Sequence, residues 1–450
     1  MRIQLKNLGI TDNCDINLNN ITVICGENNS GKTYITYAIY GFLMYWKQEY
    51  MLPISKKTIK NLLYNGAVVI DIEFYLRYAN KIIKNACKKF FKYIPTVFAT
   101  KDINFMKAVF CAEVDSLKDY YDYGEYHIVV GSKEKELFNI RKEKNSKEIQ
   151  ATLLVQQDKV EIPFFVIKKI VSDALKKIIF SKIVNDPFIV SSERTGISIF
   201  RNDLDIIRNK VLDFILRNKN TNSFLSLLND EDFYYALPIK NNIEFNRSLS
   251  NIMNRDSFVS KRYKKILKKF YDIVGGGYAV DKDGSLYFIP RNQKRKLSLG
   301  QSSSSVRALV DMYFYVKHVA QKDDILIIDE PELNLHPQNQ RRLARFLVAL
   351  SNIGIKILIT THSDYILKEI NTLIQFYVRD QRVRKIAKDE GYNSYEFLNF
   401  KKINIYMTQR KDGEKFSLNA ANITKHGIEV KTFDEVIDDM NRIQDLILWG

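Results

Sequence analysis

The sequence lacks the features that mark membrane proteins, secreted proteins and metal or disulfide frameworks. No apolar run approaches the roughly 18 residues of a membrane-spanning helix, and the opening MRIQLKNLGI has no signal-peptide core. The cysteines Cys14, Cys25, Cys87 and Cys111 form no CxxC pair, which argues against a zinc site or a disulfide framework. We therefore expect a cytoplasmic protein that does not contact a membrane.

Acidic residues are fewer than basic ones, 52 against 69, and the net charge at pH 7 is +17. This balance favours polyanionic partners such as nucleic acid. The alternative is a basic but merely solvated surface in a sequence rich in Lys, Ile and Asn. The charge is concentrated in KRYKKILKKF (261–270) and RNQKRK (291–296), which either touch nucleic acid or an acidic protein, or form a solvated face.

The pattern of apolar residues predicts an α/β fold whose sheet is interrupted by an insertion. NITVIC, DILIIDE and IKILITTHS are short apolar runs of the buried-strand type, and a helical pattern follows each of them. Residues 50–185 mix helix and strand patterns, residues 200–272 are mostly helical, and GGGYAVDKDGSLYFIP indicates a hairpin around Asp-Gly. Because no heptad pattern is sustained, we expect a short helical arm or lobe rather than a long coiled coil.

The stretch GENNSGKT, residues 26–33, has the pattern G-x-x-x-x-G-K-[ST] between an apolar strand and a helix. Its glycines let backbone N–H groups face a phosphate, and the positive end of the helix points at the anion. Lys32 would pair with the β- and γ-phosphates, and Thr33 would ligate Mg²⁺. A glycine-rich turn with a chance lysine would not account for the flanking strand and helix. The residues expected at the nucleotide are Gly26, Asn28, Asn29, Ser30, Gly31, Lys32 and Thr33.

DILIIDEPELNLHP, residues 324–337, ends an apolar strand in two acids. Asp329, at the strand end, is expected to support the Mg²⁺. Glu330, whose side chain leaves the opposite face of the strand, is expected to polarise the attacking water as general base. Alone, the pair also fits a strand that ends in two solvated acids, but the loop at 26–33 favours catalysis.

LSLGQ, residues 297–301, opens a helix that leads to the strand of Asp329. Ser298, the amide of Gly300 and Gln301 are expected to bind phosphate at the N-terminus of that helix. The alternative is that Ser298 is an ordinary N-cap. The position of the stretch, between the loop at 26–33 and Asp329, favours phosphate binding.

ITTHSDYIL places His362 at the end of a strand over 355–361. A histidine at a strand end beside a nucleotide can form a hydrogen bond with the γ-phosphate. Without the other motifs, a structural histidine would be the simpler interpretation.

In this order, the four stretches resemble the motifs of ABC-type ATPases, with GENNSGKT similar to Walker A, LSLGQ to the signature LSGGQ, ILIIDE to Walker B and THS to the switch histidine. Leu299 stands where the family has glycine, which affects how closely phosphate is contacted there. IDEPELNLHPQNQRRL resembles the OLD, RecF and structural-maintenance-of-chromosomes branch. PFIVSSERTG resembles the PxxRTG stretch of soluble AAA-15-type ATPases, which implies that Arg194 lies near the nucleotide or the dimer face. For the Q-loop glutamine, Gln156 and Gln157 are candidates.

The resemblance implies an ABC-type P-loop NTPase head that uses ATP and Mg²⁺, with Lys32, Glu330 and His362 in catalysis and Thr33 and Asp329 at the metal. In such proteins Walker A of one subunit and the signature of another clamp the same ATP, so a homodimer or higher homo-oligomer is expected. ATP would join two heads until hydrolysis releases them. The expected parts are 1–50, the first part of the head; 51–195, a lobe with the mixed insertion; 196–275, a helical arm; 276–378, the second part of the head; and 379–450, an α/β extension.

The same resemblance implies a role in bacterial anti-phage defence, as the sensor or scaffold that holds or releases a separate effector. PARIS-type ATPases, which partner a Toprim nuclease, are the nearest likeness, and Septu-type ATPases, which partner an HNH nuclease, come next. The tail is too short for a Toprim domain and shows no HNH pattern, so the nuclease or toxin would be another chain. Asp438 and Asp439 belong to an amphipathic helix, FDEVIDDMNRIQDLILW, that packs on its own domain or docks a partner.

Two alternatives to defence remain open. One is a RecF-like DNA-repair ATPase that binds duplex DNA, and the other is a scaffold that binds ATP and hydrolyses little of it. Nucleic acid or a phage protein is a further candidate partner in each case.

Overall fold

The structure of the chain is a computed structural model. It describes residues 1–100, 105, 107–114, 121, 124–131, 136–154, 163–200, 235–282, 284–378, 380–411, 415–429 and 441–447. The candidate glutamines Gln156 and Gln157, residues 201–234 of the expected helical segment, and the acids Asp438 and Asp439 lie outside the described residues.

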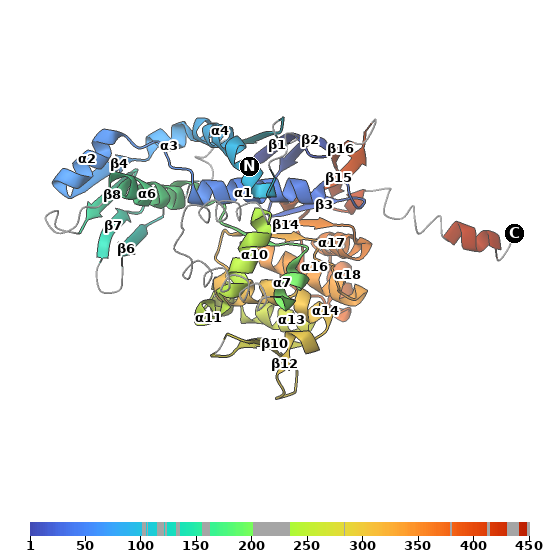
Figure 1. Cartoon of the computed structure of the whole chain (residues 1–450). Helices are drawn as coiled ribbons and strands as arrows, with labels where there is room; N and C mark the ends of the chain where they lie inside the picture. The colour runs from blue at the N-terminus through green and yellow to red at the C-terminus, as the bar shows by residue number, and fades with distance from the viewer. Residues whose placement is uncertain are drawn as a thin grey trace, which may run out of the picture.

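A mixed sheet forms the centre of the molecule (Figure 1). Its strands run in the order β5 (Val109–Glu113), β1 (Arg2–Leu8), β2 (Thr11–Asn17), β16 (Phe416–Ala420), β15 (Ile403–Arg410), β3 (Ile21–Cys25), β14 (Lys356–Thr361), β13 (Ile325–Asp329) and β9 (Pro187–Val190). The strands from β15 to β9 are parallel, whereas β5, β1 and β2 form an antiparallel edge. Every residue of β3 and β13 is buried, as expected for strands covered on both faces. The structure confirms the predicted α/β fold.

Alternate residues of the parallel strands face two hydrophobic layers. Ile325 and Ile327 of β13 belong to the layer that contains α1 (Lys32–Gln48). Leu326 and Ile328 face the other layer. The helices of that second layer include α13 (Lys264–Val274), α15 (Val310–Phe314), α16 (Pro337–Asn352) and α17 (Asp364–Gln375). The ends of the parallel strands are therefore enclosed between α1 and these helices.

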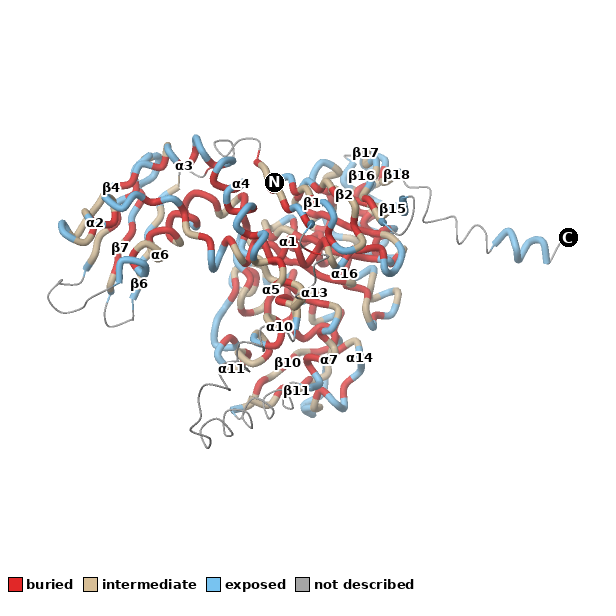
Figure 2. The backbone as a smooth tube through the Cα atoms, turned by 45° about the horizontal axis from the view of Figure 1, so that its top comes forward, coloured by how far each residue is buried: buried red, intermediate tan, exposed pale blue. Residues whose placement is uncertain are grey.

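A lobe projects from the far end of α1 (Figures 1 and 2). Its antiparallel sheet runs in the order β4 (Ala67–Asp71), β8 (Glu148–Leu153), β7 (Glu136–Lys142) and β6 (Tyr126–Gly131). The helices of the lobe and of its connection to the sheet are α2 (Lys56–Asn65), α3 (Glu73–Arg77), α4 (Ala79–Phe90), α5 (Ile94–Phe98) and α6 (Phe164–Leu175). This lobe is the mixed α/β insertion that the sequence predicts.

A buried lysine fixes the lobe to the end of α1. Lys176, the first residue of η4 (Lys176–Phe180), which continues α6, donates hydrogen bonds to the carbonyls of Trp46 (2.9 Å), Lys47 (3.0 Å) and Tyr50 (2.9 Å). Carbonyls at a helix C-terminus have no partner within the helix, and the helix dipole favours a cation there. Burial lowers the pKa of Lys176, while its ion pair with Asp173 (2.7 Å) acts in the opposite direction.

Helices and a small sheet connect the lobe to the second half of the central sheet. The helices are α7 (Arg194–Ile199), α10 (Leu237–Arg247), α11 (Leu249–Ile252) and α12 (Phe258–Arg262), followed by α13. The predicted hairpin around Asp-Gly is present as β10 (Gly276–Val280) and β11 (Leu286–Pro290), and β12 (Leu297–Ser298) pairs with β11. The helix predicted after LSLGQ is divided into η6 (Leu299–Gln301), α14 (Ser304–Ala308), α15 and η7 (Tyr315–Val319).

The central sheet contains strands from parts of the chain that the sequence analysis expects to lie outside the head. β9 comes from the part 51–195, and β15 and β16 come from the part 379–450. β15 lies directly beside β3, and β16 pairs with β2, so these segments belong to the head. Outside the sheet, the tail adds α18 (Gln381–Asp389) and the hairpin of β17 (Asn422–Thr424) and β18 (Gly427–Glu429).

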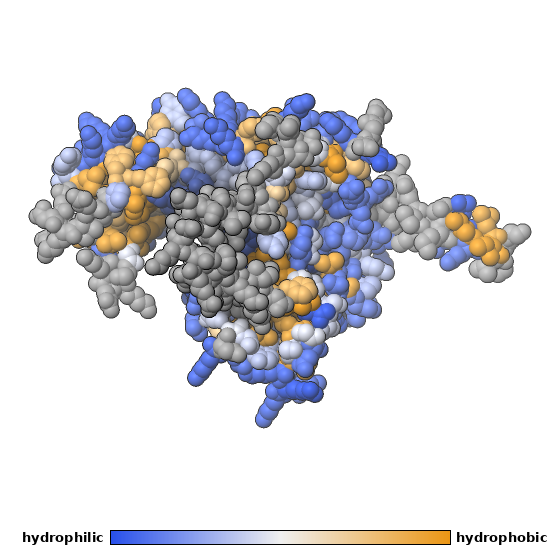
Figure 3. Space-filling view, in the orientation of Figure 1, coloured by the Kyte–Doolittle hydropathy of each residue, from blue (hydrophilic) through white to orange (hydrophobic). Residues whose placement is uncertain are grey.

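Residues 441–447 form a short helix whose side chains are all exposed (Figure 3). Ile443, Leu446 and Ile447 are among them, so this part of the expected amphipathic helix does not pack on its own domain. None of the helices in the described ranges combines the length and hydropathy of a bilayer crossing.

A buried polar network lies under the edge of the sheet at β9. Asn242 of α10 accepts a hydrogen bond from the N–H of Ser191 (2.9 Å) and donates one to the carbonyl of Ile189 (2.6 Å). One turn later, Asn246 donates to Oδ1 of Asp311 in α15 (2.7 Å). Among the described residues the other Asp311 oxygen has no partner, and burial raises the pKa of Asp311 to about 7.

Asp311 should make the stability of the fold depend on pH. Its carboxyl ionises near pH 4 in the unfolded chain and near pH 7 in the fold, so the free energy of unfolding falls as pH rises between these values. In Asp311→Asn we expect this fall to shrink, by up to about 4 kcal/mol. Urea unfolding at several pH values measures it, with Asp272→Asn, an exposed carboxylate, as control. An unchanged pH dependence in Asp311→Asn would contradict the prediction.

Candidate nucleotide-binding site

The glycine-rich loop joins the end of β3 to the start of α1. Gly26 has a φ of +144°, and a Cβ there would lie 1.8 Å from Oγ1 of Thr408. Gly31 has a φ of +87°, and a Cβ there would lie 2.6 Å from Cγ2 of Thr11. Both positions therefore require glycine. Within the described residues no side chain caps the start of α1, which leaves its first N–H groups to an anion.

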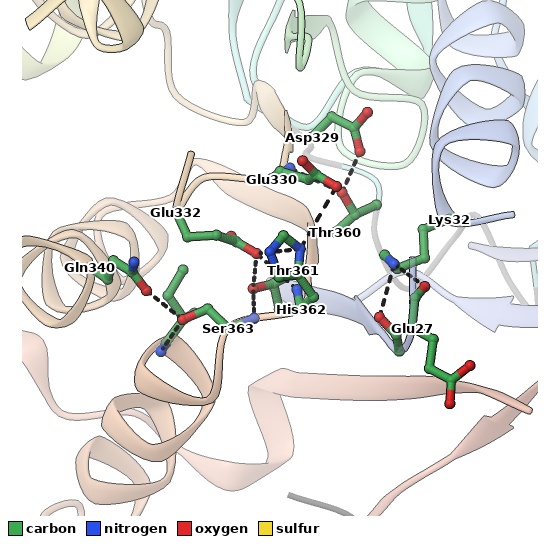
Figure 4. A network of polar contacts seen from close by, with 12 residues as sticks. Glu27, Lys32, Asp329, Glu330, Glu332, Gln340, Thr360, Thr361, His362 and Ser363 are labelled. Atoms are coloured by element: carbon green, nitrogen blue, oxygen red, sulfur yellow. Dashed lines mark hydrogen bonds and ion pairs between the residues drawn. The ribbon is translucent and has the colours of Figure 1, made fainter. Parts of the chain in front are cut away.

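Lys32 is the first residue of α1, and its side chain folds over the loop (Figure 4). Its ammonium donates hydrogen bonds to the carbonyls of Gly26 (2.9 Å) and Glu27 (2.6 Å). Burial lowers the pKa of Lys32, and the carboxylates of Glu330 and Asp329 act in the opposite direction. The cation is thus held inside the loop for which the sequence predicts phosphate binding.

The remaining loop residues differ in exposure. Ser30 is buried, donates to the carbonyl of Glu27 (2.7 Å) and accepts from Thr408 (2.9 Å). Asn28 and Asn29 are exposed, and Asn29 has a φ of +58°, a conformation that asparagine tolerates. Ser30 therefore shapes the loop, whereas the two asparagines face outward.

Thr33 and Asp329 meet although they are far apart in the sequence. Oγ1 of Thr33 donates a hydrogen bond to Oδ2 of Asp329 (3.0 Å), and Thr360 of β14 donates to Oδ1. Burial raises the pKa of Asp329, and these two hydrogen bonds act against it. Hydroxyl and carboxylate oxygens are ligands that Mg²⁺ prefers, so this pair fits the predicted metal.

Glu330 follows Asp329 in the left-handed conformation, with a φ of +52°. Its N–H donates to the carbonyl (3.2 Å) and the hydroxyl (3.1 Å) of Thr360. His362 follows β14, and its Nδ1 lies 3.8 Å from Oε1 of Glu330 and 3.3 Å from Oε1 of Glu332. The fold therefore brings the predicted base and the predicted histidine together, with Glu332 beside them (Figure 4).

Arg194 holds the turn at Glu330 from beneath. Its buried guanidinium donates hydrogen bonds to the carbonyls of Asp329 (2.8 Å), Glu330 (2.6 Å), Ser191 (3.0 Å) and Ala308 (3.0 Å). Burial lowers the pKa of Arg194. Since Ala308 ends α14, the same side chain links the turn after β13 to the helix after LSLGQ. Arg194 therefore lies behind the acids of the site and does not line the surface.

The signature residues lie apart from the loop at 26–33. In Figures 1 and 2, α14 is near the lower end of the molecule, away from α1. Ser298 and Gln301 form a capping box, in which the N–H of Ser298 donates to Gln301 (3.2 Å). A Cβ at Gly300 would meet nothing nearer than Oγ of Ser298 at 3.9 Å, so packing in this chain does not require glycine there. Leu299 is buried in the second hydrophobic layer, which explains its departure from the family pattern.

The sheet, the loop and the Thr33–Asp329 contact define a P-loop nucleoside triphosphatase. The chain belongs to the AAA-15 family, since residues 1–367 match the family model described as an AAA ATPase domain. No curated protein matches the chain.

Solved structures of chromosome-maintenance heads resemble the chain at low identity. An Smc head bound to the C-terminal winged-helix domain of ScpA has 13% identity and a TM-score of 0.37, covering 94% of this chain and 98% of its own. An Smc head with an extended coiled coil bound to the C-terminal domain of ScpA, from Pyrococcus furiosus, has 13% identity, 98% coverage of both chains and a TM-score of 0.33. The SMC head domain of Thermotoga maritima has 10% identity, coverage of 94% and 98%, and a TM-score of 0.30.

Some residues of the site have no role in the sequence prediction. Thr360 supports Asp329, and Glu332 contacts His362. Glu193, at the start of α7, accepts a hydrogen bond from Tyr37 of α1 (3.1 Å). Thr360 lies two residues before His362 and Glu332 two residues after Glu330. This closeness in the sequence was the available signal that they belong to the site.

Replacing Arg194 by lysine should destabilise the fold. An ammonium lacks the planar fork of donors, so carbonyls of the turn stay buried without partners. We expect the free energy of unfolding to fall by about 2–4 kcal/mol in urea titrations. Arg341→Lys on α16 is the control and should cost less, because Arg341 is half-exposed and its buried partner Glu369 keeps a second ion pair with Arg345. Equal losses in the two variants would show that the carbonyl contacts of Arg194 are not decisive.

Proposed function

We propose that the chain binds ATP with Mg²⁺ and hydrolyses it as an ABC-type ATPase. The observation that carries this proposal is the 3.0 Å hydrogen bond between Thr33 and Asp329. It joins the start of α1 to the end of β13, directly beside the loop that holds Lys32. Membership of the AAA ATPase domain family supports the choice of nucleotide.

Each residue has a separate task in the proposed reaction. Lys32 would exchange the loop carbonyls for phosphate oxygens. Thr33 and Asp329 would hold the Mg²⁺, which neutralises phosphate charge when bound. Glu330 would accept the proton of the attacking water, and His362 would form a hydrogen bond with the γ-phosphate.

The position of the signature supports a dimer that shares its nucleotides. The signature stretch begins in β12 and ends before α14, and Figure 1 shows both of these elements away from α1. The space around Gly300 lets another molecule approach the backbone closely. A nucleotide bound to a second copy is the ligand that fits this position. ATP would then hold two copies together, and hydrolysis would release them.

Mixing two inactive variants tests the shared site. Lys32→Ala removes the phosphate lysine and Ser298→Arg blocks the signature, so each variant alone should lack turnover. In a mixed dimer, one of the two sites combines an intact Lys32 with an intact Ser298. We expect co-expression to restore roughly a quarter of wild-type turnover, because half of randomly formed dimers carry one intact site. If turnover does not return, the two motifs do not act across a dimer.

We further propose that the ATPase serves anti-phage defence as the sensor or scaffold of a separate effector, a Toprim or HNH nuclease or another toxin. The resemblance of PFIVSSERTG to soluble AAA-15-type ATPases of prokaryotic defence islands supports this role. Joining and separating two heads supplies the switch that a sensor needs. The exposed Ile443, Leu446 and Ile447 offer apolar contacts for such an effector.

Glu330→Gln tests whether turnover serves defence. The amide cannot take the proton of the attacking water, so we expect turnover to fall by at least about 100-fold while an ATP-bound dimer persists. Size-exclusion chromatography with light scattering detects that dimer. In cells that carry the chain with its neighbouring gene, wild type should reduce phage plating and the variant should not. Full protection by Glu330→Gln would separate defence from hydrolysis.

A basic surface favours a RecF-like DNA-binding ATPase as the second candidate. The ion pair of Arg291 and Asp272 (2.7 Å) joins the exposed loop 291–296, which precedes the signature, to α13. Exposed cations continue along α12 and α13 at Lys261, Arg262, Lys264, Lys265 and Lys268. Stimulation of turnover by duplex DNA, lost at high salt, would favour this function over defence. A chain that binds ATP without turnover under either condition would favour the scaffold.

A further inference from the structure

Glu332 lies in the site but has no task in the proposed reaction. It follows the turn at Glu330, and its buried carboxylate points back to the end of β14 (Figure 4). Oε1 accepts hydrogen bonds from the hydroxyl of Thr361 (2.9 Å) and from the backbone N–H of His362 (2.8 Å). The same oxygen lies 3.3 Å from Nδ1 of the His362 ring. One carboxylate oxygen therefore contacts both the main chain and the ring of the histidine.

The chain also fixes His362 from its other side. The N–H of Ser363 donates to Thr361 (3.0 Å), and its hydroxyl caps α17 and donates to Gln340 of α16 (2.5 Å). The main chain around His362 is thus attached to β14, α16 and α17. The ring itself is 44% exposed, so its orientation depends on the group that contacts Nδ1.

The carboxylate of Glu332 has donors at only one of its two oxygens. Its second oxygen, Oε2, is buried and has no hydrogen-bond partner in the described part of the chain. A buried carboxylate is costly unless donors or a cation balance it. Lys32 and Arg194 donate to backbone carbonyls, so the ring of His362 is the nitrogen-bearing side chain that lies against Glu332. Because Nδ1 faces Glu332 and Glu330, Nε2 is the ring nitrogen left for a phosphate oxygen.

We propose that Glu332 is the positioning residue of His362. Glu332 holds the backbone at the end of β14 and orients the ring of His362 with Nδ1 inward, so that Nε2 is presented to the nucleotide. Its consequence for turnover rests on the proposed ATPase function. The orientation of the ring does not, and it can be measured without hydrolysis.

Glu332→Gln keeps Oε1 as an acceptor and removes the charge. We expect turnover to fall about 10- to 100-fold, as for other partners that orient a functional side chain. ATP affinity, measured with a fluorescent ATP analogue and Mg²⁺, should change much less than turnover because Lys32 and Thr33 are intact. Glu332→Asp keeps the charge and should show a smaller loss of turnover than Glu332→Gln. It also provides a second test if the glutamine variant folds poorly.

A double-mutant comparison separates positioning from a structural role. In a His362→Gln background, Glu332→Gln should lower turnover no further, because Glu332 acts through the ring. Equal losses in both backgrounds, or no loss in the wild-type background, would overturn the proposal. Unfolding in urea checks that the compared variants are folded.

Nitrogen-15 NMR of the histidine rings gives a readout that needs no turnover. The chain has five histidines, and the signals lost in His362→Gln identify this ring. Glu332→Gln should shift its Nδ1 signal, whereas Glu396→Gln, a buried carboxylate paired with Lys269 elsewhere, should not. Unchanged His362 signals in Glu332→Gln would overturn the proposal whatever turnover shows. If Glu332→Gln shifts the His362 signal but the wild-type chain does not bind ATP, only the proposed function is contradicted.

Discussion

The parallel pairing of β3, β14 and β13 is the constraint on which the site depends. Asp329 is in register with Thr360, and Thr360 is in register with Ile24, so the carboxyl ends of the strands align. The loop after β3 then starts α1 beside these ends, and Thr33 reaches Asp329. Side chains alternate along a strand, so a slip of one residue would turn Asp329 to the other face. The buried apolar runs that set this register thus also set the chemistry.

Charge at the strand ends is unbalanced in a way that suits a divalent cation. Acids of several elements gather there, and the buried cations among them, Lys32 and Arg194, both bond to backbone carbonyls rather than to the carboxylates. Burial raises the pKa of Asp329 under these conditions. A bound divalent cation would relieve this excess of negative charge and stabilise the ionised acids. Binding of such a cation would therefore change the charge balance of the buried strand ends.

The sequence predicts the local parts of the site, because a loop with required glycines and acids at the end of an apolar run are patterns within a few residues. It does not predict contacts that depend on distant pairing. The insertion of β15 beside β3 and the burial of Arg194 under Glu330 both join segments far apart in the chain. Glu332 escapes prediction because the left-handed turn at Glu330, not strand alternation, decides where its side chain points.

Helix α1 has the nucleotide loop at one end and the carbonyls bound by Lys176 at the other. Its 17 residues span about 25 Å, and a helix packed along a sheet moves as a stiff rod. A small tilt at the loop becomes a larger displacement at the opposite end, in proportion to that length. The position of the lobe would then depend on whether the loop is occupied, so a partner that contacts the lobe could detect nucleotide binding.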